Sequence, residues 1–209
     1  GTGELGRVRL AVPTTIAAGF LADLLHCYRQ QWPGVELELF DGRAKDAILR
    51  VREGSLDVAF VAAITDVPDC HCRALWTEPL FIAVSTRDLR ASGDALHWCD
   101  LKDDLFLVRY NGTGPQVHDH VLRRFEERGL QPRVQRCNVD RCLLLSMVAG
   151  DYGITLCSEA TAQAAFPGVT FLPLRDEPEP LRFSAIWSPH NSSKALRGLL
   201  DLARSRATI

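Results

Sequence analysis

Two adjacent threonines stand near the start of the chain, where an apolar strand gives way to a predicted helix. The stretch LAVPTTIAAGF places Thr14 and Thr15 directly before the helix predicted at 16–31. A helix N-terminus offers unpaired N–H groups and about half a positive charge, which favours a carboxylate or another anion. Threonine hydroxyls add hydrogen-bond donors. The pair could therefore cap the helix or hold a ligand.

Further candidate ligand contacts follow other predicted strands. Arg43 and Ala44 lie in the turn FDGRAKDAI, where the guanidinium could grip a carboxylate bidentately or simply be solvated. The turn RYNGTGP contains Arg109, Asn111 and Gly112, and its glycines allow close backbone approach or tight turning. This turn is either a ligand loop or a flexible connection. Three more strand ends supply candidate contacts, namely Ala63, Asn138 and Thr155.

Motifs for catalysis or for a tightly bound group are missing from the sequence. The two threonines and Ser158 have no base partner at motif spacing, the six histidines form no HExxH, and neither GxxxxGK[ST] nor GxGxxG occurs. Cys70-His71-Cys72 could attract a metal, but no second ligand pair follows at finger-like spacing. We expect no enzyme activity, no metal and no cofactor.

Composition points to an ordinary globular protein of the cytoplasm. The 209 residues are 46% hydrophobic and 24% charged, with a net charge of −2, which argues against direct nucleic-acid binding. No apolar run approaches the roughly 18 residues that span a bilayer, and no signal peptide is visible. The odd count of seven scattered cysteines favours reduced thiols over a disulfide framework. We therefore expect neither a membrane partner nor secretion.

The elements that must position these candidates alternate between strands and helices. Residues 7–63 predict strand–helix–strand–helix–strand, and the apolar run LDVAFVAA is typical of a buried parallel strand. A similar order starts again at 105, with a helix predicted at 116–129 and another at 140–149. The fold class is therefore α/β, with two successive Rossmann-like halves.

Two lobes joined by two crossing strands would accommodate this order. The first lobe comprises residues 1–84 plus 176–209 and the second comprises 85–175, with crossings expected near 78–86 and 171–176. Ligands of α/β proteins bind beyond the carboxyl ends of the strands. In a two-lobed chain those ends can face each other across a cleft that closes on a small molecule.

Several motifs in order resemble the effector-binding (regulatory) domain of LysR-type bacterial transcriptional regulators. They are GRVRLAVPTT, WPGVELELFDG, LRVREGSLDVAFV, EPLFIAVS, LLLSMVAGDYGITL, GVTFLPL and AIWSPHNSSKALRGLLDLA, which together span essentially the whole chain. The pair EGSLDVAF and VAGDYGITL, at this separation, is the most specific part. The resemblance implies a fold like that of type II periplasmic binding proteins. A transport-type solute-binding protein of the same fold is the alternative.

The resemblance also implies where an effector binds. Thr14 and Thr15 match the polar pair of the family at the end of the first strand. The family commonly has Ser or Thr two residues after the acidic-Gly pair, whereas this chain has Ala44 with Arg43 beside it. Arg43 could replace the missing hydroxyl. One branch of the family senses peroxide through cysteines, but the loop 110–120 that would contain them has none.

Partners follow from the same resemblance. The effector would be a small, anionic molecule, and DNA would be bound only through an N-terminal winged helix-turn-helix, which this chain, opening on GTGELG, lacks. We expect a homodimer in which helix 16–31 packs antiparallel against helix 116–129 of a second copy. The full-length protein would then be a tetramer.

Overall fold

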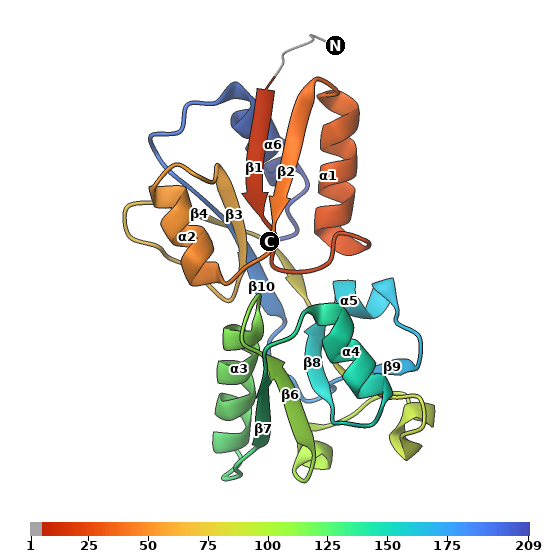
Figure 1. Cartoon of the computed structure of the whole chain (residues 1–209). Coiled ribbons are helices and arrows are strands. Elements are labelled where there is room, and N and C mark those ends of the chain that lie inside the picture. Colours follow the sequence, from red (N-terminus) through yellow and green to blue (C-terminus); the bar gives the residue numbers. More distant parts are fainter. Residues whose placement is uncertain (1–5) are drawn as a thin grey trace. The chain divides into compact units, whose positions relative to one another are not determined.

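A computed structural model describes residues 6–209, and the opening residues 1–5 lie outside the described part (Figure 1). The described chain forms two compact units. The first unit contains the chain up to Thr77 together with Arg182–Ile209, and the second contains Glu78–Leu181. Both consist of strands alternating with helices, so the predicted α/β class is confirmed.

The first unit contains a five-stranded sheet in the order β2-β1-β3-β10-β4. Strand β1 pairs in parallel with β2 and β3, and β10 runs antiparallel to β3. The elements of this unit, in chain order, are β1 (Gly6–Ala11), α1 (Gly19–Gln31), β2 (Val35–Phe40), α2 (Ala44–Arg52), β3 (Val58–Ala62), β4 (His71–Glu78), β10 (Leu181–Trp187) and α6 (Lys194–Ser205).

Apolar side chains on both faces of this sheet explain why its central strands are apolar throughout. Ala47 and Val51 of α2 pack on one face, in a cluster with Ala59 and Val61 of β3. Helices α1 and α6 are joined by a buried hydrogen bond of 2.7 Å from the Tyr28 hydroxyl to the Ala195 carbonyl. Strand residues between two helical layers must be apolar on both sides, which is the pattern of LDVAFVAA.

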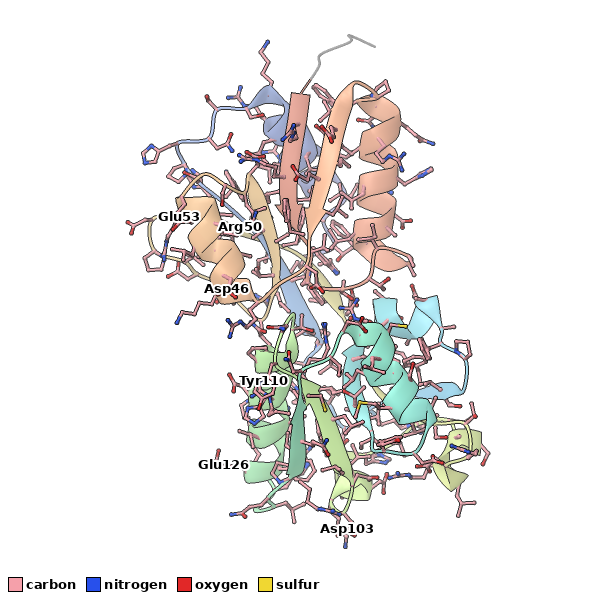
Figure 2. All side chains as sticks on the ribbon, in the orientation of Figure 1. Asp46, Arg50, Glu53, Asp103, Tyr110 and Glu126 are labelled. Atoms are coloured by element: carbon pink, nitrogen blue, oxygen red, sulfur yellow. The ribbon has the colours of Figure 1, made fainter. Side chains whose placement is uncertain are left out.

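Charged side chains occupy the outer face of α2, as its amphipathic pattern requires. Asp46, Arg50 and Glu53 follow one another at helical spacing on this face (Figure 2). The Arg50 guanidinium lies 4.3 Å from the centre of the Phe40 ring, a cation–π contact that covers the end of β2. The outer face of the helix is therefore solvated while its inner face holds the core.

The second unit repeats this architecture with its own strands. Strand β6 is parallel to β7, and β5 lies antiparallel between β8 and β9. Two short 3-10 helices occupy Leu89–Ser92 and Trp98–Leu101. The other elements are β5 (Leu80–Ser85), β6 (Leu105–Arg109), α3 (Gly114–Glu126), β7 (Arg133–Cys137), α4 (Arg141–Ala149), β8 (Thr155–Ser158), α5 (Glu159–Ala164) and β9 (Val169–Pro173).

Backbone hydrogen bonds join the strands of the second unit into the same order as those of the first. Leu107 N–H donates to Ile154 at 2.8 Å, and Ile154 N–H donates to Leu105 at 2.9 Å, which attaches β6 to the segment leading into β8. The resulting order is β7-β6-β8-β5-β9, which matches β2-β1-β3-β10-β4 position by position. The two halves therefore share a topology without a detectable sequence repeat.

Alternation along the strands divides the core of the second unit into two layers. Ile82 of β5 and Phe106 of β6 face a cluster that includes Phe125 of α3 and Trp98. Ala83 and Leu107, the neighbouring residues on the same strands, face α4 on the other side. Each strand thus contributes to both layers, and helices cover both faces of the sheet.

The boundaries between the units differ from those expected from the sequence. The chain passes from the first unit to the second after Thr77 rather than after residue 84, and returns after Leu181 rather than after 175. Strand β5, expected as a crossing strand, is hydrogen-bonded on both sides within the second unit, and β9 is one of its partners. The boundaries instead fall within β4 and β10.

Two local features also depart from expectation. Strand β4 has no counterpart among the predicted elements, because HCRALWTE shows no clean alternation of apolar and polar residues. Helix α1 begins at Gly19, not at 16, so an irregular segment separates it from Thr15.

Within residues 6–209, no helix combines the length and apolar character needed to cross a bilayer.

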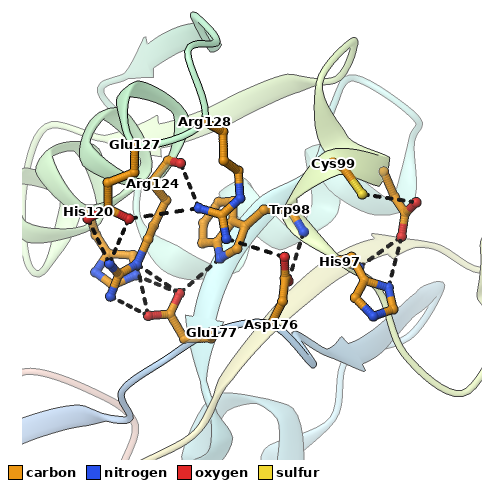
Figure 3. Close-up of polar contacts among 10 residues, drawn as sticks. His97, Trp98, Cys99, His120, Arg124, Glu127, Arg128, Asp176 and Glu177 are labelled. Carbon is orange, nitrogen blue, oxygen red and sulfur yellow. Dashed lines mark hydrogen bonds and ion pairs between the residues drawn. The ribbon is translucent and has the colours of Figure 1, made fainter.

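A buried carboxylate ties the segment before β10 to the rest of the second unit (Figure 3). Glu177 accepts hydrogen bonds from Arg124 Nη2 at 2.7 Å and from the Trp98 indole at 3.0 Å, and His120 Nε2 lies 3.1 Å away. The Glu177 and Arg124 side chains are only 4% and 7% exposed. The EPEP stretch at 177–180 is therefore anchored at its first residue.

The partners of Glu177 keep it ionised despite its burial. Burial alone would raise the pKa of this carboxyl, but the hydrogen bonds and charge attraction of His120 and Arg124, with the Trp98 hydrogen bond, lower the pKa from 4.5 to about 2. The folded state therefore binds this proton less readily than the unfolded chain. The stabilisation is complete above about pH 4.5 and is lost as the pH falls towards 2.

Replacing Glu177 with Gln should destabilise the second unit by about 3 kcal/mol, because Arg124 would keep its charge in a buried position without its main partner. Equilibrium urea unfolding at pH 7 measures this loss. Glu179→Gln is the matched control, since Glu179 is exposed two residues further along, and should change stability by less than about 0.5 kcal/mol. The difference between wild type and Glu177→Gln should shrink as the pH falls from 4.5 to 2. Equal stability of the two variants would contradict this role.

Candidate functional site

The carboxyl ends of the parallel strands gather the predicted contacts of the first unit at one edge of its sheet. Because β1, β2 and β3 run in the same direction, the residues that follow them emerge together. A hydrogen bond of 3.0 Å from Val12 N–H to the Phe40 carbonyl continues the pairing past the end of β1. The turns at this edge contain Thr14, Thr15, Arg43, Ala44 and Ala63.

Thr14 and Thr15 do not cap helix α1. The N-cap residue is Ala18, and no side chain hydrogen-bonds to the first turn. The Thr15 hydroxyl instead accepts a hydrogen bond of 3.1 Å from Ala17 N–H. Thr14 is 8% exposed, and no residue in the described range 6–209 hydrogen-bonds its hydroxyl. Of the two interpretations given by the sequence, capping is therefore wrong.

The N-terminus of α2 lies at the same edge and is not capped by a side chain. Arg43 is the N-cap residue, and its Nε donates to Asp46 at 3.0 Å instead of turning towards the helix end. Both side chains are about half exposed, and such ion pairs contribute at most about 1 kcal/mol. Arg43 can therefore exchange Asp46 for another carboxylate at little cost. Ala44 is the first helical residue and packs partly against the core.

Ala63 stands out by its backbone. Its φ angle is +57°, in the left-handed region that residues other than glycine seldom adopt. Ala63 N–H donates to the Arg182 carbonyl at 2.9 Å, which continues the pairing of β3 and β10 one residue past the strand. A costly conformation of this kind, directly after a central strand, is typical of functional turns.

The corresponding edge of the second unit contains the turns after β6 and β7. Tyr110 N–H donates to the Cys137 carbonyl at 3.0 Å, so the two turns start side by side. Asn111 and Asn138 are exposed there. Tyr110, labelled in Figure 2, is 50% exposed, and the Arg136 guanidinium lies 4.8 Å from the centre of its ring. The sequence did not point to Tyr110 or Arg136, although Tyr110 lies inside the motif RYNGTGP.

The position of Arg109 explains why glycines occupy positions 112 and 114 of the motif RYNGTGP. Its side chain is 6% exposed, and its guanidinium lies where a Cβ atom at Gly112 would be. Gly112 also has a φ angle of +58°, and a Cβ at Gly114 would meet the Arg109 carbonyl. The turn therefore wraps tightly around Arg109, and the alternative of a flexible connection does not describe it.

Thr155 and Asp140 have structural partners. Thr155 is the first residue of β8, is 3% exposed, and donates its hydroxyl proton to the Leu107 carbonyl at 2.7 Å. That hydrogen bond supports the sheet and sets Thr155 apart from the other predicted contacts. The Asp140 carboxylate accepts a hydrogen bond of 2.8 Å from Leu143 N–H and so caps the N-terminus of α4.

Electrostatics at both edges suit an anion. Helices α1, α2 and α3 all begin without a side-chain cap, which leaves N–H groups and the positive end of each helix dipole for a ligand. Arg43 adds a guanidinium in the first unit, and Arg109 and Arg136 add two in the second. Carboxylates also occur in these turns, with Asp41 after β2 in the first unit and Asp140 after β7 in the second.

The cysteines at the start of β4 do not form a metal centre. Within residues 6–209 there is no group of three or more His, Cys, Asp and Glu side chains that could hold a metal ion. Burial raises the pKa of the Cys72 thiol, which disfavours the thiolate that metals bind. His71 packs instead against Trp187, with ring centres 5.3 Å apart.

Comparison with known sequences identifies a family. The model of the LysR substrate binding domain matches residues 1–208. The HTH-type transcriptional regulator TtuA of Agrobacterium vitis is 26% identical over 168 residues, which are 80% of this chain and 55% of that protein. The HTH-type transcriptional regulator BenM of Acinetobacter baylyi is 27% identical over 171 residues, 81% of this chain and 56% of that protein. The chain thus spans little more than half the length of these relatives, which are regulators by name and not enzymes.

Solved structures show the same fold. The effector binding domain of BenM with its effector benzoate has a TM-score of 0.79 at 24% identity, covering 96% of this chain and 91% of that one. The effector binding domain of QuiR in complex with shikimate has a TM-score of 0.81 at 19% identity and covers 98% of each chain. At these identities the likeness establishes the fold, which is that of type II periplasmic binding proteins.

Gly112→Ala should destabilise the protein by about 1–3 kcal/mol, because the new Cβ meets the Arg109 guanidinium and the backbone is held at positive φ. Thermal unfolding measures the loss. Gly42→Ala is the matched control in the turn after β2, where a Cβ meets nothing within 4 Å, and should cost less than about 0.5 kcal/mol. If both substitutions have the same effect, the turn is not built around Arg109.

Proposed function

Because this chain belongs to the family of LysR substrate binding domains, we propose that it is the ligand-sensing part of a bacterial LysR-type transcriptional regulator. It binds a small anionic effector, and the full-length protein then changes how it binds DNA. The family match over residues 1–208 supports this, as do relatives that are transcriptional regulators by name. The observation that carries the proposal is the set of uncapped helix ends and arginines at the carboxyl edges of both sheets.

Each unit offers candidate contacts to an effector at the carboxyl edge of its own sheet in this proposal. The first unit contributes the Thr14 and Thr15 hydroxyls and the backbone around Arg43, Ala44 and Ala63. The second unit contributes the turn wrapped around Arg109, with the exposed residues Asn111 and Asn138 and the close-approaching backbone of Gly112. Arg43 takes the place of the hydroxyl that Ala44 lacks, because its ion pair with Asp46 is half exposed and easily exchanged.

The remainder of the full-length protein contacts DNA in this proposal, through a separate N-terminal domain. Effector binding shifts the regulator between two arrangements because the effector has a different affinity for each.

We place the protein in the cytoplasm, where its DNA lies. A transport-type solute-binding protein shares the fold, but the relatives that the chain matches are regulators.

The double substitution Thr14→Val/Thr15→Val should weaken effector binding about tenfold or more, because each lost hydroxyl removes a hydrogen bond worth about 1 kcal/mol to the ligand. Benzoate, shikimate and other small organic acids are titrated into wild type and variant by isothermal calorimetry. Valine nearly preserves the shape of threonine, so the fold should be retained.

Thr170→Val, a threonine of β9 outside the proposed site, serves as the control and should bind like wild type. An acid that binds Thr14→Val/Thr15→Val as tightly as wild type has a binding site that does not include these two threonines, and if every acid that binds behaves in this way, the proposed effector site is wrong. Neutral compounds are titrated alongside the acids. If only the neutral compounds bind, the proposal of an anionic effector is wrong.

We also propose a homodimer through α1 and α3, with tetramers in the full-length protein. A groove of about 720 Å³ follows α1 and the edge strand β2, lined in part by Ile16, Leu25 and Leu39. Ile16 and Leu39 are 43% and 38% exposed, and Leu122 of α3 is 40% exposed. A two-fold interface in which α3 of one copy lies in the α1 groove of the other would bury all three.

Leu122→Asp should convert the dimer to monomer at micromolar concentration, because a charge would be buried in an apolar groove. Sedimentation velocity measures the change in mass. Leu89→Asp is the control, since Leu89 is 94% exposed on the short helix after β5 and lies outside the interface. A wild type that sediments only as a monomer would refute the dimer.

A further inference from the structure

A second concave site lies within the first unit, among elements that the proposed effector site does not use. It is a cavity of about 190 Å³ bounded by β4, by the end of β10 and by α6. We call it the arginine pocket. Its lining residues are Arg73, Leu75, Ala185, Trp187, Arg197, Leu200, Asp201 and Arg204.

Positive charge dominates the rim of the arginine pocket. Arg197 and Arg204 lie seven residues apart on α6 and therefore share a face, and Arg73 approaches from β4. Asp201 is the single carboxylate in the lining, which leaves an excess of two positive charges on a chain whose net charge is −2.

These three guanidinium groups have no partner in the described part of the chain. None of them donates a hydrogen bond or approaches a carboxylate within 4 Å, and Asp201, within one helical turn of both Arg197 and Arg204, does not pair with either. Most other arginines near a carboxylate here do form such pairs, for example Arg9 with Asp57 and Arg90 with Asp104. The guanidinium N–H donors at the rim of the pocket are therefore available to a ligand.

The floor of the arginine pocket is apolar. Leu75 and Ala185 are 1% and 0% exposed, and Leu200 covers the helix side. Trp187 is partly exposed at the end of β10, with one side of its ring near His71. An indole surface beside guanidinium groups recognises a planar body that bears an anionic group.

From this geometry we propose that the arginine pocket is a second ligand site, which binds a small organic carboxylate with a flat apolar body. A guanidinium donates two parallel hydrogen bonds to a carboxylate, and the apolar floor accepts the body of the ligand. The cavity is smaller than the roughly 300 Å³ at which pockets for drug-sized ligands begin, which restricts the ligand to a compact acid. The pocket shares no residue with the proposed effector site, so each site can be altered by substitutions that leave the residues of the other in place.

Benzoate is the probe for this site, and the Trp187 indole N–H is the reporter. The chain has four tryptophans, so ¹H–¹⁵N spectra show few indole resonances, and Trp187→Phe identifies the one that belongs to the pocket. Benzoate should shift this resonance saturably with a dissociation constant of about 1 mM or tighter. Arg73→Gln/Arg204→Gln should weaken the binding about tenfold or more, because charge-assisted hydrogen bonds are lost.

Three controls distinguish binding in the arginine pocket from binding at the effector site and from unspecific attraction of anions. Thr14→Val/Thr15→Val should leave the Trp187 shift unchanged, since it alters only the proposed effector site. Arg182→Gln/Arg206→Gln removes two exposed arginines that do not line the pocket, and should also leave the shift unchanged. Benzamide, which has the same flat body without the charge, should produce no saturable shift.

Four results would overturn the proposal. The first is that the Trp187 resonance shows no saturable shift up to about 10 mM benzoate. The second and third are an equal shift in the Arg73→Gln/Arg204→Gln variant and loss of the shift in Thr14→Val/Thr15→Val. The fourth is that inorganic phosphate binds as tightly as benzoate. The last would show a simple anion site in which the apolar floor has no part.

Discussion

Parallel pairing of the first strand of each unit is the constraint on which the rest of the structure depends. Strand β1 lies between β2 and β3, and β6 pairs with β7 in the same sense, so in each unit the turns that follow these strands emerge at one edge of that unit's own sheet. Helices begin at that edge with their unpaired N–H groups pointing outward. Residues that are far apart along the chain, such as Thr14 and Ala63, thereby lie at the same edge of the sheet, and the helix N-termini give that edge the positive potential that suits the proposed anionic ligand.

Polar groups that are buried away from the site hold this frame in place. Glu177 satisfies Arg124, Trp98 and His120 together, and this anchors the chain just before it returns to the first unit as β10. In the first unit, Asp57 accepts hydrogen bonds from Arg9 and Asn191 and joins β1 to the segment before α6. Both carboxylates have lowered pKa values, because these hydrogen bonds outweigh the cost of burial. At the carboxyl edges of the sheets, by contrast, helices α1, α2 and α3 begin without a side-chain cap, which leaves backbone N–H groups there for the proposed ligand.

The proposed ligand contacts include arginines in two different states. Arg109 is buried, and the turn around it contains glycines where a Cβ atom would collide with Arg109. Its position is therefore set before any ligand arrives. Arg43 and the arginines of the arginine pocket are exposed and free to reorient, which costs side-chain entropy on binding. A preorganised group contributes more to affinity and a mobile group more to adaptability. In the proposed function, this combination suits a sensor that discriminates one acid from others.

The sequence by itself determined the order of strands and helices, the α/β class and the positions of most turns, because hydrophobic periodicity and glycine chemistry are local properties. It also pointed to Thr14, Thr15, Arg43 and the RYNGTGP turn, since these directly follow apolar strands. Tertiary structure alone decided the pairing of β5 within the second unit, the strand β4, the structural role of Thr155 and the anchoring by Glu177. Each of these depends on partners that are distant in the chain, which no local pattern encodes.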